Sequence, residues 1–359
     1  MQQLRIVIHI IVNVILISYL HCEDLSVNIV PISSRFTTKQ DVTINLNYKN
    51  KGSKSMLIYK WYLPTEQLFD PLFEVTRDGK SVEYIGPLVK RRSPKTEDMI
   101  SIGSGQTMST RVQLSSVYNM TETGNYVIQF KAKIKSTSSS SKIESLSSSN
   151  VLDESALESP PIKLFAEGRS NSILNEIQSK LASQSRSTTY SFTSCSSTQQ
   201  TSIISAIKSA ASYSSNCVQY LTKFTLPASS RYTTWFGTYS LNNLMTLRTH
   251  FTNINSVLSS KPMSFDCSCQ EKNTFAFVYA NIPYKIHLCP EFWTSATVGT
   301  DSKAGTLVHE TSHFTIVAGT KDNAYGQTDA KNLAKKNPTL ALNNADNHEY
   351  FAENNPALK

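Results

Sequence analysis

Two histidines and a glutamate in the segment His309-Glu310-Thr311-Ser312-His313 have the spacing of a catalytic zinc site. On a helix, residues four apart lie on one face, so both imidazoles can reach a single tetrahedral ion. Glu310 can then point into the same cleft without being a ligand, as a general base that takes a proton from the attacking water. The alternative is an amphipathic helix that carries two histidines by chance.

The flanking residues predict that this motif lies inside a helix. The run Ala304-Gly305-Thr306-Leu307-Val308 leads into it, and Ser302 or Asp301 can serve as the N-cap. Gly319 follows six residues after His313 and is a typical residue for ending a helix. We therefore expect the histidines to be held by a helix that ends near Gly319.

A catalytic zinc needs a third protein ligand and one open position. The metzincin pattern requires glycine at position 316 and histidine at 319, and Ile316 and Gly319 exclude it. A thermolysin-like enzyme would take Glu349 or Glu353 from a later helix. The nearer candidate is Asp322, because Gly319 can turn the chain sharply and return a short carboxylate to the metal.

The segment Gly319-Thr320-Lys321-Asp322-Asn323-Ala324-Tyr325-Gly326, after the HExxH motif, resembles the pattern of the aspzincin metallopeptidases. This family includes deuterolysin and the fungal peptidyl-Lys endopeptidases, and the resemblance is closest to the peptidyl-Lys type. It runs from about residue 191 to 359 and includes the segments 231–237, 265–269 and 344–351.

The resemblance implies a role for each residue of the motif. His309, His313 and Asp322 would bind one zinc ion per catalytic domain, and Glu310 would be the base. Tyr325 would donate a hydrogen bond to the oxyanion, which suits the general need for donors at developing charge. Plain core packing is the alternative for Tyr325.

Asp346 and Glu349 are three residues apart and share one face of a predicted helix. Considered alone, they are a solvated acidic stripe, the usual position of carboxylates. In the peptidyl-Lys enzymes, however, the matching pair lines the pocket for the residue after the scissile bond. Two carboxylates in a partly desolvated pocket would favour a lysine ammonium. We therefore expect cleavage on the amino side of lysine.

The cysteines indicate an oxidising compartment. The resemblance implies two disulfides, Cys195–Cys267 and Cys269–Cys289. A structural zinc at Cys267 and Cys269 lacks a matching second cysteine pair. Cys217 continues the apolar face of a predicted helix, which favours a buried free thiol over an intermolecular disulfide.

The chain of 359 residues is expected to have more than one domain. Residues 1–22 resemble a signal peptide, with an uncleaved anchor as the alternative. Alternating strands at 41–48, 126–132 and 161–165 predict an all-β immunoglobulin-like sandwich over 23–167. Residues 136–150 are a serine-rich loop, 168–190 a linker and processing region, and 191–359 the peptidase domain.

We expect the peptidase domain to be mainly helical and zincin-like, with a small sheet. Apolar periodicity predicts its elements, namely helices at 198–221, 241–258, 303–316, 327–336 and 338–353 and strands at 274–279 and 285–288.

The N-terminal module is interpreted as a propeptide that restrains a secreted zymogen and is removed by cleavage between about Ser179 and Tyr190. A permanent binding module is the alternative. The formal charge of +8 does not indicate nucleic acid, because the basic residues are scattered. Lys90-Arg91-Arg92, the one compact basic run, is interpreted as a solvated loop or as a site for another protease.

These features together predict a secreted, extracellular zinc metalloendopeptidase that acts on lysine-containing proteins or peptides, without nucleic acid and without stable membrane insertion. The alternatives are a broad-specificity deuterolysin-like peptidase and a non-enzymatic binding protein with a structural zinc.

Overall fold

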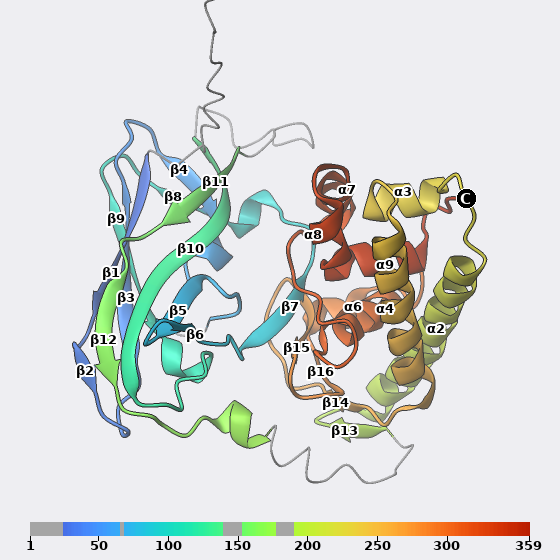
Figure 1. Ribbon diagram of the computed structural model, residues 1–359, viewed down its shortest axis with the longest axis horizontal. Coiled ribbons are helices and arrows are strands. Elements are labelled where there is room, and N and C mark those ends of the chain that lie inside the picture. Colours follow the sequence, from blue (N-terminus) through green and yellow to red (C-terminus); the bar gives the residue numbers. More distant parts are fainter. Residues whose placement is uncertain (1–23, 65–67, 139–152, 177–189) are drawn as a thin grey trace, which may run out of the picture.

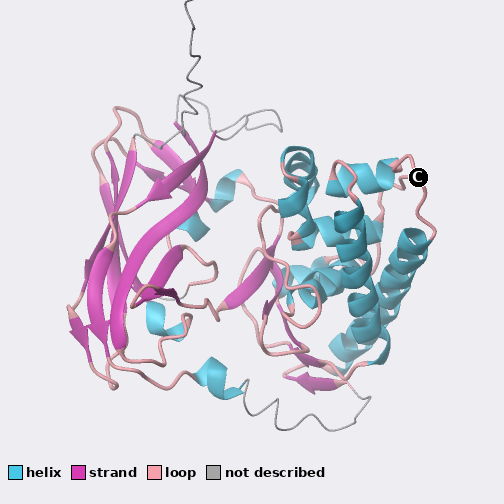
Figure 2. Ribbon diagram, in the orientation of Figure 1, coloured by secondary structure: helices cyan, strands magenta, loops and turns pink. Residues whose placement is uncertain are grey.

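The structure is a computed structural model that describes residues 24–64, 68–138, 153–176 and 190–359. Its N-terminal half consists mainly of strands and its C-terminal half mainly of helices, as Figures 1 and 2 show. Each half has its own cluster of buried apolar side chains. The predicted signal peptide, most of the serine-rich loop and nearly all of the predicted processing region lie outside the described residues.

The N-terminal half contains two sheets. One has the strand order β1-β3-β9, formed by Leu25–Pro31, Thr43–Asn50 and Thr107–Gln113. The other follows the order β2-β12-β10-β4-β8, and β11, β5 and β6 join it through β10. Its strands are β2 (Arg35–Phe36), β4 (Met56–Tyr59), β5 (Phe73–Arg77), β6 (Lys80–Ser81), β8 (Met99–Ile102), β10 (Gly124–Ser138), β11 (Asp153–Glu158) and β12 (Ile162–Ala166).

The predicted strands are found as β3, β10 and β12. Ile44, Leu46 and Tyr48 of β3 alternate with more exposed residues and are fully buried, as expected of a strand with one face on a core. The N-terminal half is therefore β-rich as predicted, and the immunoglobulin-like topology stays a prediction.

A third sheet lies in the C-terminal half and has the order β13-β14-β16-β15-β7. Four of its strands come from that half: β13 (Ser191–Thr193), β14 (Ser264–Asp266), β15 (Thr274–Tyr279) and β16 (Lys285–Leu288). The fifth, β7 (Pro87–Arg91), comes from the N-terminal half and pairs antiparallel with β15. This pairing joins the two halves along a sheet edge.

Helices pack on one another around the C-terminal core (Figure 1). They are α2 (Ser197–Thr222), α3 (Ser230–Phe236), α4 (Leu241–Ser260), α5 (Pro290–Thr294), α6 (Lys303–His313), α7 (Gly326–Lys336), α8 (Pro338–Leu342) and α9 (Ala345–Glu353). The predicted elements at 198–221, 241–258, 327–336, 274–279 and 285–288 are confirmed within a few residues. Helices α3 and α5 were not predicted.

Two helix predictions were wrong in their limits. The helix expected over 303–316 ends at His313, because Phe314 takes an extended ψ of 128° and the amide of Thr315 donates to the carbonyl of Ala280 instead. The helix expected over 338–353 is broken into α8 and α9, because Asn344 forms an isolated parallel bridge with Lys321. Both breaks lie next to the candidate site.

Both predicted disulfides are present, with Cys195 bonded to Cys267 and Cys269 bonded to Cys289. Cys217 is a buried free thiol, as predicted, and accepts a hydrogen bond from Arg231. Burial raises the pKa of the Cys217 thiol to about 12, so this cysteine is held unreactive. Within the described ranges, we find no helix with the length and apolar character needed to span a membrane.

Candidate metal centre and lysine pocket

Helix α6 holds both histidines and the glutamate of the motif at the centre of the C-terminal half. Its N-cap is Ser302, whose Oγ accepts from the amide of Gly305 at 2.9 Å. The Glu353 carboxylate in turn accepts from the amide of Ser302 at 2.9 Å and from its hydroxyl at 2.8 Å. Every residue of α6 is buried, so neighbouring helices fix its position.

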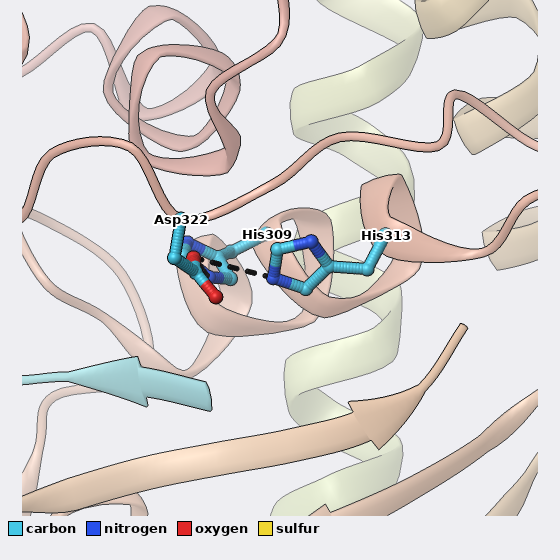
Figure 3. Close-up of side chains that lie close together, drawn as sticks. All are labelled: His309, His313 and Asp322. Atoms are coloured by element: carbon cyan, nitrogen blue, oxygen red, sulfur yellow. Dashed lines mark ion pairs between the residues drawn. The ribbon is translucent and has the colours of Figure 1, made fainter. Parts of the chain in front are cut away.

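His309, His313 and Asp322 converge on one point, as Figure 3 shows. Nε2 of His309 lies 3.1 Å from Oδ1 of Asp322, and Nε2 of His313 lies 3.4 Å from the same oxygen. The two imidazole rings are nearly perpendicular, at 85°. The prediction that these three side chains share a site agrees with this geometry.

A tight turn brings Asp322 back to the helix. Gly319 has φ +62°, in the left-handed region that favours glycine. The amide of Thr320 donates to the carbonyl of Ser312, and the hydroxyls of the same two residues lie 2.6 Å apart. The turn is thus bonded to the last turn of α6, and the ligand loop and the helix form one unit.

The other ring nitrogen of each histidine faces an oxygen acceptor. Nδ1 of His313 donates to the carbonyl of Thr320 at 2.9 Å. Nδ1 of His309 lies 2.9 Å from Oδ1 of Asp346. A proton on Nδ1 leaves the Nε2 lone pair for a metal, which is the usual arrangement of metal-binding histidines.

These residues fit a zinc ion. Among the described residues, Nε2 of both histidines and Oδ1 of Asp322 are buried and make no hydrogen bond, a costly arrangement unless a cation satisfies them. Burial raises the pKa of the Asp322 carboxyl, but the two imidazoles outweigh burial and hold it well below its usual range. Two imidazoles and one carboxylate are a donor set typical of catalytic zinc.

Glu310 lies beside this point and is completely buried. Within the described part of the chain, neither of its carboxylate oxygens has a hydrogen-bond partner. Burial raises the pKa of Glu310 to about 8. A carboxylate of raised pKa without a fixed partner is suited to take and return a proton near neutral pH.

Asp346 and Glu349 form a second buried cluster, on the Nδ1 side of His309. Both are fully buried, so the solvated acidic stripe considered from the sequence is ruled out. The ammonium of Lys90 fills the cluster, with Nζ 2.6 Å from Oε2 of Glu349 and 3.7 Å from Oδ1 of Asp346. These two carboxylates and His309 are also close enough together to bind a metal. The structure therefore shows an ammonium, rather than a metal ion, between these carboxylates.

The thermolysin-like alternative does not agree with this arrangement. Of the groups that the described residues bring within metal-binding reach, none combines both histidines with Glu349 or Glu353. Glu353 instead binds the N-terminus of α6. Asp322 is therefore the carboxylate that joins the two histidines.

The interpretation of Lys90-Arg91-Arg92 as a solvated loop was wrong. Lys90 is fully buried, and the side chains of Arg91 and Arg92 are only 11% and 10% exposed. Lys90 Nζ also lies 4.8 Å from the ring centroid of Phe275, which forms a wall of the pocket. The contact depends on a strand pairing across the chain, and no local pattern indicates it.

Asp301 is a further residue of the pocket that the sequence did not indicate beyond a possible capping role. Its Oδ1 lies 3.4 Å from Lys90 Nζ and accepts a hydrogen bond from the Tyr350 hydroxyl at 2.7 Å. The N-cap prediction is confirmed for Ser302, which leaves the Asp301 side chain free to face the ammonium. Its position just before a helix N-terminus was the only available signal.

Tyr325 contacts the strand that carries Lys90. Its hydroxyl donates to the carbonyl of Val89 at 3.0 Å and accepts from Nη1 of Arg91 at 2.9 Å. The next amide, of Gly326, donates to Oδ2 of Asp346 at 2.6 Å, which ties Tyr325 to the pocket. The hydroxyl therefore points at a peptide carbonyl, and plain core packing does not account for it.

The site combines two histidines on one helix, a buried glutamate between them and an oxygen ligand from the loop that follows the helix. This combination is typical of a metallopeptidase. Residues 223–353 match a family described as lysine-specific metallo-endopeptidase. An extracellular protease from Aeromonas hydrophila is 39% identical to the chain over 318 residues, covering 88% of this chain and 89% of that protein. A peptidyl-Lys metalloendopeptidase from Grifola frondosa is 35% identical, covering 92% of this chain and 90% of that protein.

The chain belongs to the aspzincin family of metalloendopeptidases. A solved zinc peptidase from Grifola frondosa is 50% identical and covers 46% of this chain and all of that protein, with a TM-score of 0.44. Membership of a peptidase family removes the non-enzymatic binding protein as an alternative.

Proposed function

We propose that this chain is a secreted zinc metalloendopeptidase that hydrolyses peptide bonds on the amino side of lysine. The observation that carries the proposal is the placement of one lysine within the molecule. Lys90 has its ammonium against Glu349, and the carbonyl of the residue before it accepts from Tyr325. A substrate bound in this way would have its scissile bond directly before the lysine.

His309, His313 and Asp322 would hold the zinc ion in this proposal. When bound, zinc supplies a Lewis acid that polarises the scissile carbonyl and lowers the pKa of water. Glu310 takes a proton from the attacking water and delivers it to the leaving amine. The Tyr325 hydroxyl donates to the carbonyl oxygen as negative charge develops there.

Asp346 has two partners in this scheme. Its Oδ1 lies 2.9 Å from Nδ1 of His309 and 3.7 Å from the Lys90 ammonium nitrogen. The same carboxylate thus orients a metal ligand and helps to recognise the substrate. Glu349, which is closer to the ammonium, carries the larger part of the selectivity.

The proposal includes the division of the chain given by its sequence. Residues 1–22 are a signal peptide, 23–167 a propeptide domain of immunoglobulin-like type, 168–190 a linker that is cut, and 191–359 the catalytic domain. The name of the Aeromonas relative and the two disulfides support secretion. Its substrates are proteins or peptides that contain lysine.

A cleavage-site profile of the processed enzyme on a mixed peptide library, determined by mass spectrometry, tests the proposal. We expect cuts before lysine in nearly every product. Cuts without preference for lysine would favour the broad-specificity, deuterolysin-like alternative and would remove Asp346 and Glu349 from substrate recognition.

A further inference from the structure

Strand β7 comes from the N-terminal half but completes the sheet of the catalytic half. Its neighbours along the chain, β6 and β8, both lie in the eight-stranded N-terminal sheet. Val89 pairs with Phe277 and Lys90 with Ala276 of β15, in antiparallel register. β7 and β15 lie side by side between the two halves of the molecule (Figure 1). β7 therefore covers the sheet edge to which an extended peptide could add.

The peptide bond between Val89 and Lys90 lies across the candidate active site. The Val89 amide donates to Oδ2 of Asp322 at 3.1 Å, and the Val89 carbonyl accepts from Tyr325 at 3.0 Å. The next side chain, Lys90, enters the pocket and reaches Glu349. In Figure 3 the cyan strand beside the three ligands is β7. Three independent contacts thus place this bond where the bond of a lysine substrate would lie.

Arg91 fixes the segment to the N-terminal half. Its guanidinium forms a bidentate pair with Asp70, at 3.0 and 2.9 Å, and its Cζ lies 5.6 Å from the ring centroid of Trp61. Two parallel charge-assisted hydrogen bonds fix the orientation of the arginine. The strand is therefore held by its own half while it lies in the cleft of the other.

Arg92 makes a second set of contacts, with residues of both halves of the molecule. Nη1 and Nη2 of Arg92 donate to the Asp98 carboxylate at 3.0 and 3.1 Å, and its Nε donates to Asn273 of the catalytic half at 3.1 Å. Gly326 lies against Ser93, whose Oγ would be only 2.5 Å from a Cβ at position 326. The segment is thus attached on both sides of the interface before any substrate arrives.

We infer that residues 87–92 form an inhibitory segment that imitates a lysine substrate and closes the active site of the same chain. This inference rests on the proposed function and adds its regulation. The segment is intramolecular and already ordered, so it competes with free peptides at a high effective concentration. The Lys90 ammonium occupies the pocket beside Glu349, and a substrate lysine must replace it.

The test measures peptide binding by the intact chain rather than hydrolysis. A Glu310→Gln background keeps the zinc-loaded chain from cutting itself or the probe. The probe is a fluorescent peptide with one internal lysine, and a second peptide carries alanine in its place. Anisotropy titrations compare this background with added Lys90→Met, Arg91→Ala or Lys39→Ala. Lys39 is an exposed lysine of the same half and serves as the matched control.

We expect Lys90→Met to tighten binding of the lysine peptide at least about tenfold, because the segment loses the ion pair that competes with the probe. Arg91→Ala should tighten it by less, and Lys39→Ala should leave it unchanged. Methionine keeps the length of the side chain, whereas Arg91→Ala leaves Lys90 in the pocket and removes the pair with Asp70 instead. The two variants therefore do not share one folding defect.

Unchanged affinity in both test variants, with native circular dichroism and full zinc content, would overturn the inhibitory segment. The inference would also fail if the Glu310→Gln chain alone bound the lysine peptide as tightly as the chain with added Lys90→Met. Equal tightening for the lysine and alanine peptides would instead reject the lysine pocket. The inference and the proposed function therefore fail in different ways.

Discussion

We call the two nitrogen-bearing edges of the His309 ring its Nε2 face and its Nδ1 face. The two differ in which groups satisfy the charged and polar atoms around them. On the Nε2 face, His313 and Asp322 turn their free lone pairs towards one point, and no atom of the described chain satisfies them. On the Nδ1 face, Asp346 and Glu349 surround an ammonium that the chain itself supplies. Both faces attract cations, but only the first has two imidazoles, which suit zinc better than an ammonium. One buried ring therefore separates the proposed metal centre from the proposed lysine pocket.

Removing one carboxylate from each face tests whether only the Nε2 face binds the metal. Asp322→Ala should lose zinc and with it essentially all activity, whereas Glu349→Gln should keep zinc at the wild-type ratio. Metal analysis of dialysed protein gives the ratio. If Glu349→Gln lost zinc and Asp322→Ala retained it, the assignment of the two faces would be reversed.

Glu310→Ala should lower kcat by about 10²–10⁴-fold while leaving zinc bound, because it removes the proton carrier and no ligand. The measurement is kcat of the processed enzyme on a lysine peptide, together with metal analysis. Full activity in this variant would show that another group is the base.

Comparing the carboxylates of the pocket shows how much each contributes to the preference for lysine. Asp301→Asn should weaken the preference for lysine less than Glu349→Gln does, since its oxygen lies 3.4 Å rather than 2.6 Å from the ammonium. Values of kcat/KM for matched lysine and alanine peptides measure the preference. An effect of Asp301→Asn equal to that of Glu349→Gln would contradict this ranking.

Two serine caps allow a smaller test of how α6 supports the site. Ser302→Ala and Ser240→Ala each remove an N-cap oxygen, from α6 and α4, and each should lower the free energy of unfolding by about 1 kcal/mol. Only Ser302→Ala should also lower kcat, because α6 carries the catalytic groups. Denaturant titration and kinetics check the pair, and equal kcat values would remove the positional role of Ser302.

An acid dependence of stability is expected from the histidine pair His250 and His348. His348 donates from Nδ1 to the Asn344 carbonyl, so its Nε2 accepts from Nδ1 of His250. Burial lowers the pKa of His250 to about 4 and that of His348 to about 3, so both are neutral in the folded chain.

The unfolded chain then binds more protons than the folded one below about pH 6.5. Stability from this pair should be complete above that pH and fall as the pH drops towards 4. His250→Asn should flatten the fall in thermal unfolding temperature over this range. An identical pH profile in the variant would exclude the pair as its cause.

The convergence of the three proposed metal ligands could be predicted from the sequence, because helix geometry and a short turn determine their positions. The motif 309–313 needs only helical spacing, and Gly319 returns Asp322 within nine residues. The pocket pair, three apart on α9, is equally local. The break before α9 was missed because Asn344 is held by Lys321, a contact that periodicity does not indicate.

Lys90 could not be assigned from the sequence, for a physical reason. Lys90 begins a run of three basic residues, and its burial depends on pairing with residue 276, far away along the chain. Local composition predicts exposure for such a run, whereas the ion pair with Glu349 and the strand pairing override it. The most informative contact for specificity is thus the one with the weakest sequence signal.

The central claim is that Glu349 selects lysine while His309, His313 and Asp322 hold the catalytic metal. The most direct test is the cleavage-site profile of the processed enzyme beside that of its Glu349→Gln variant, on one peptide library. We expect cuts before lysine from the enzyme and a broad loss of that preference, with zinc retained, from the variant. An unchanged lysine preference in the variant would contradict the account.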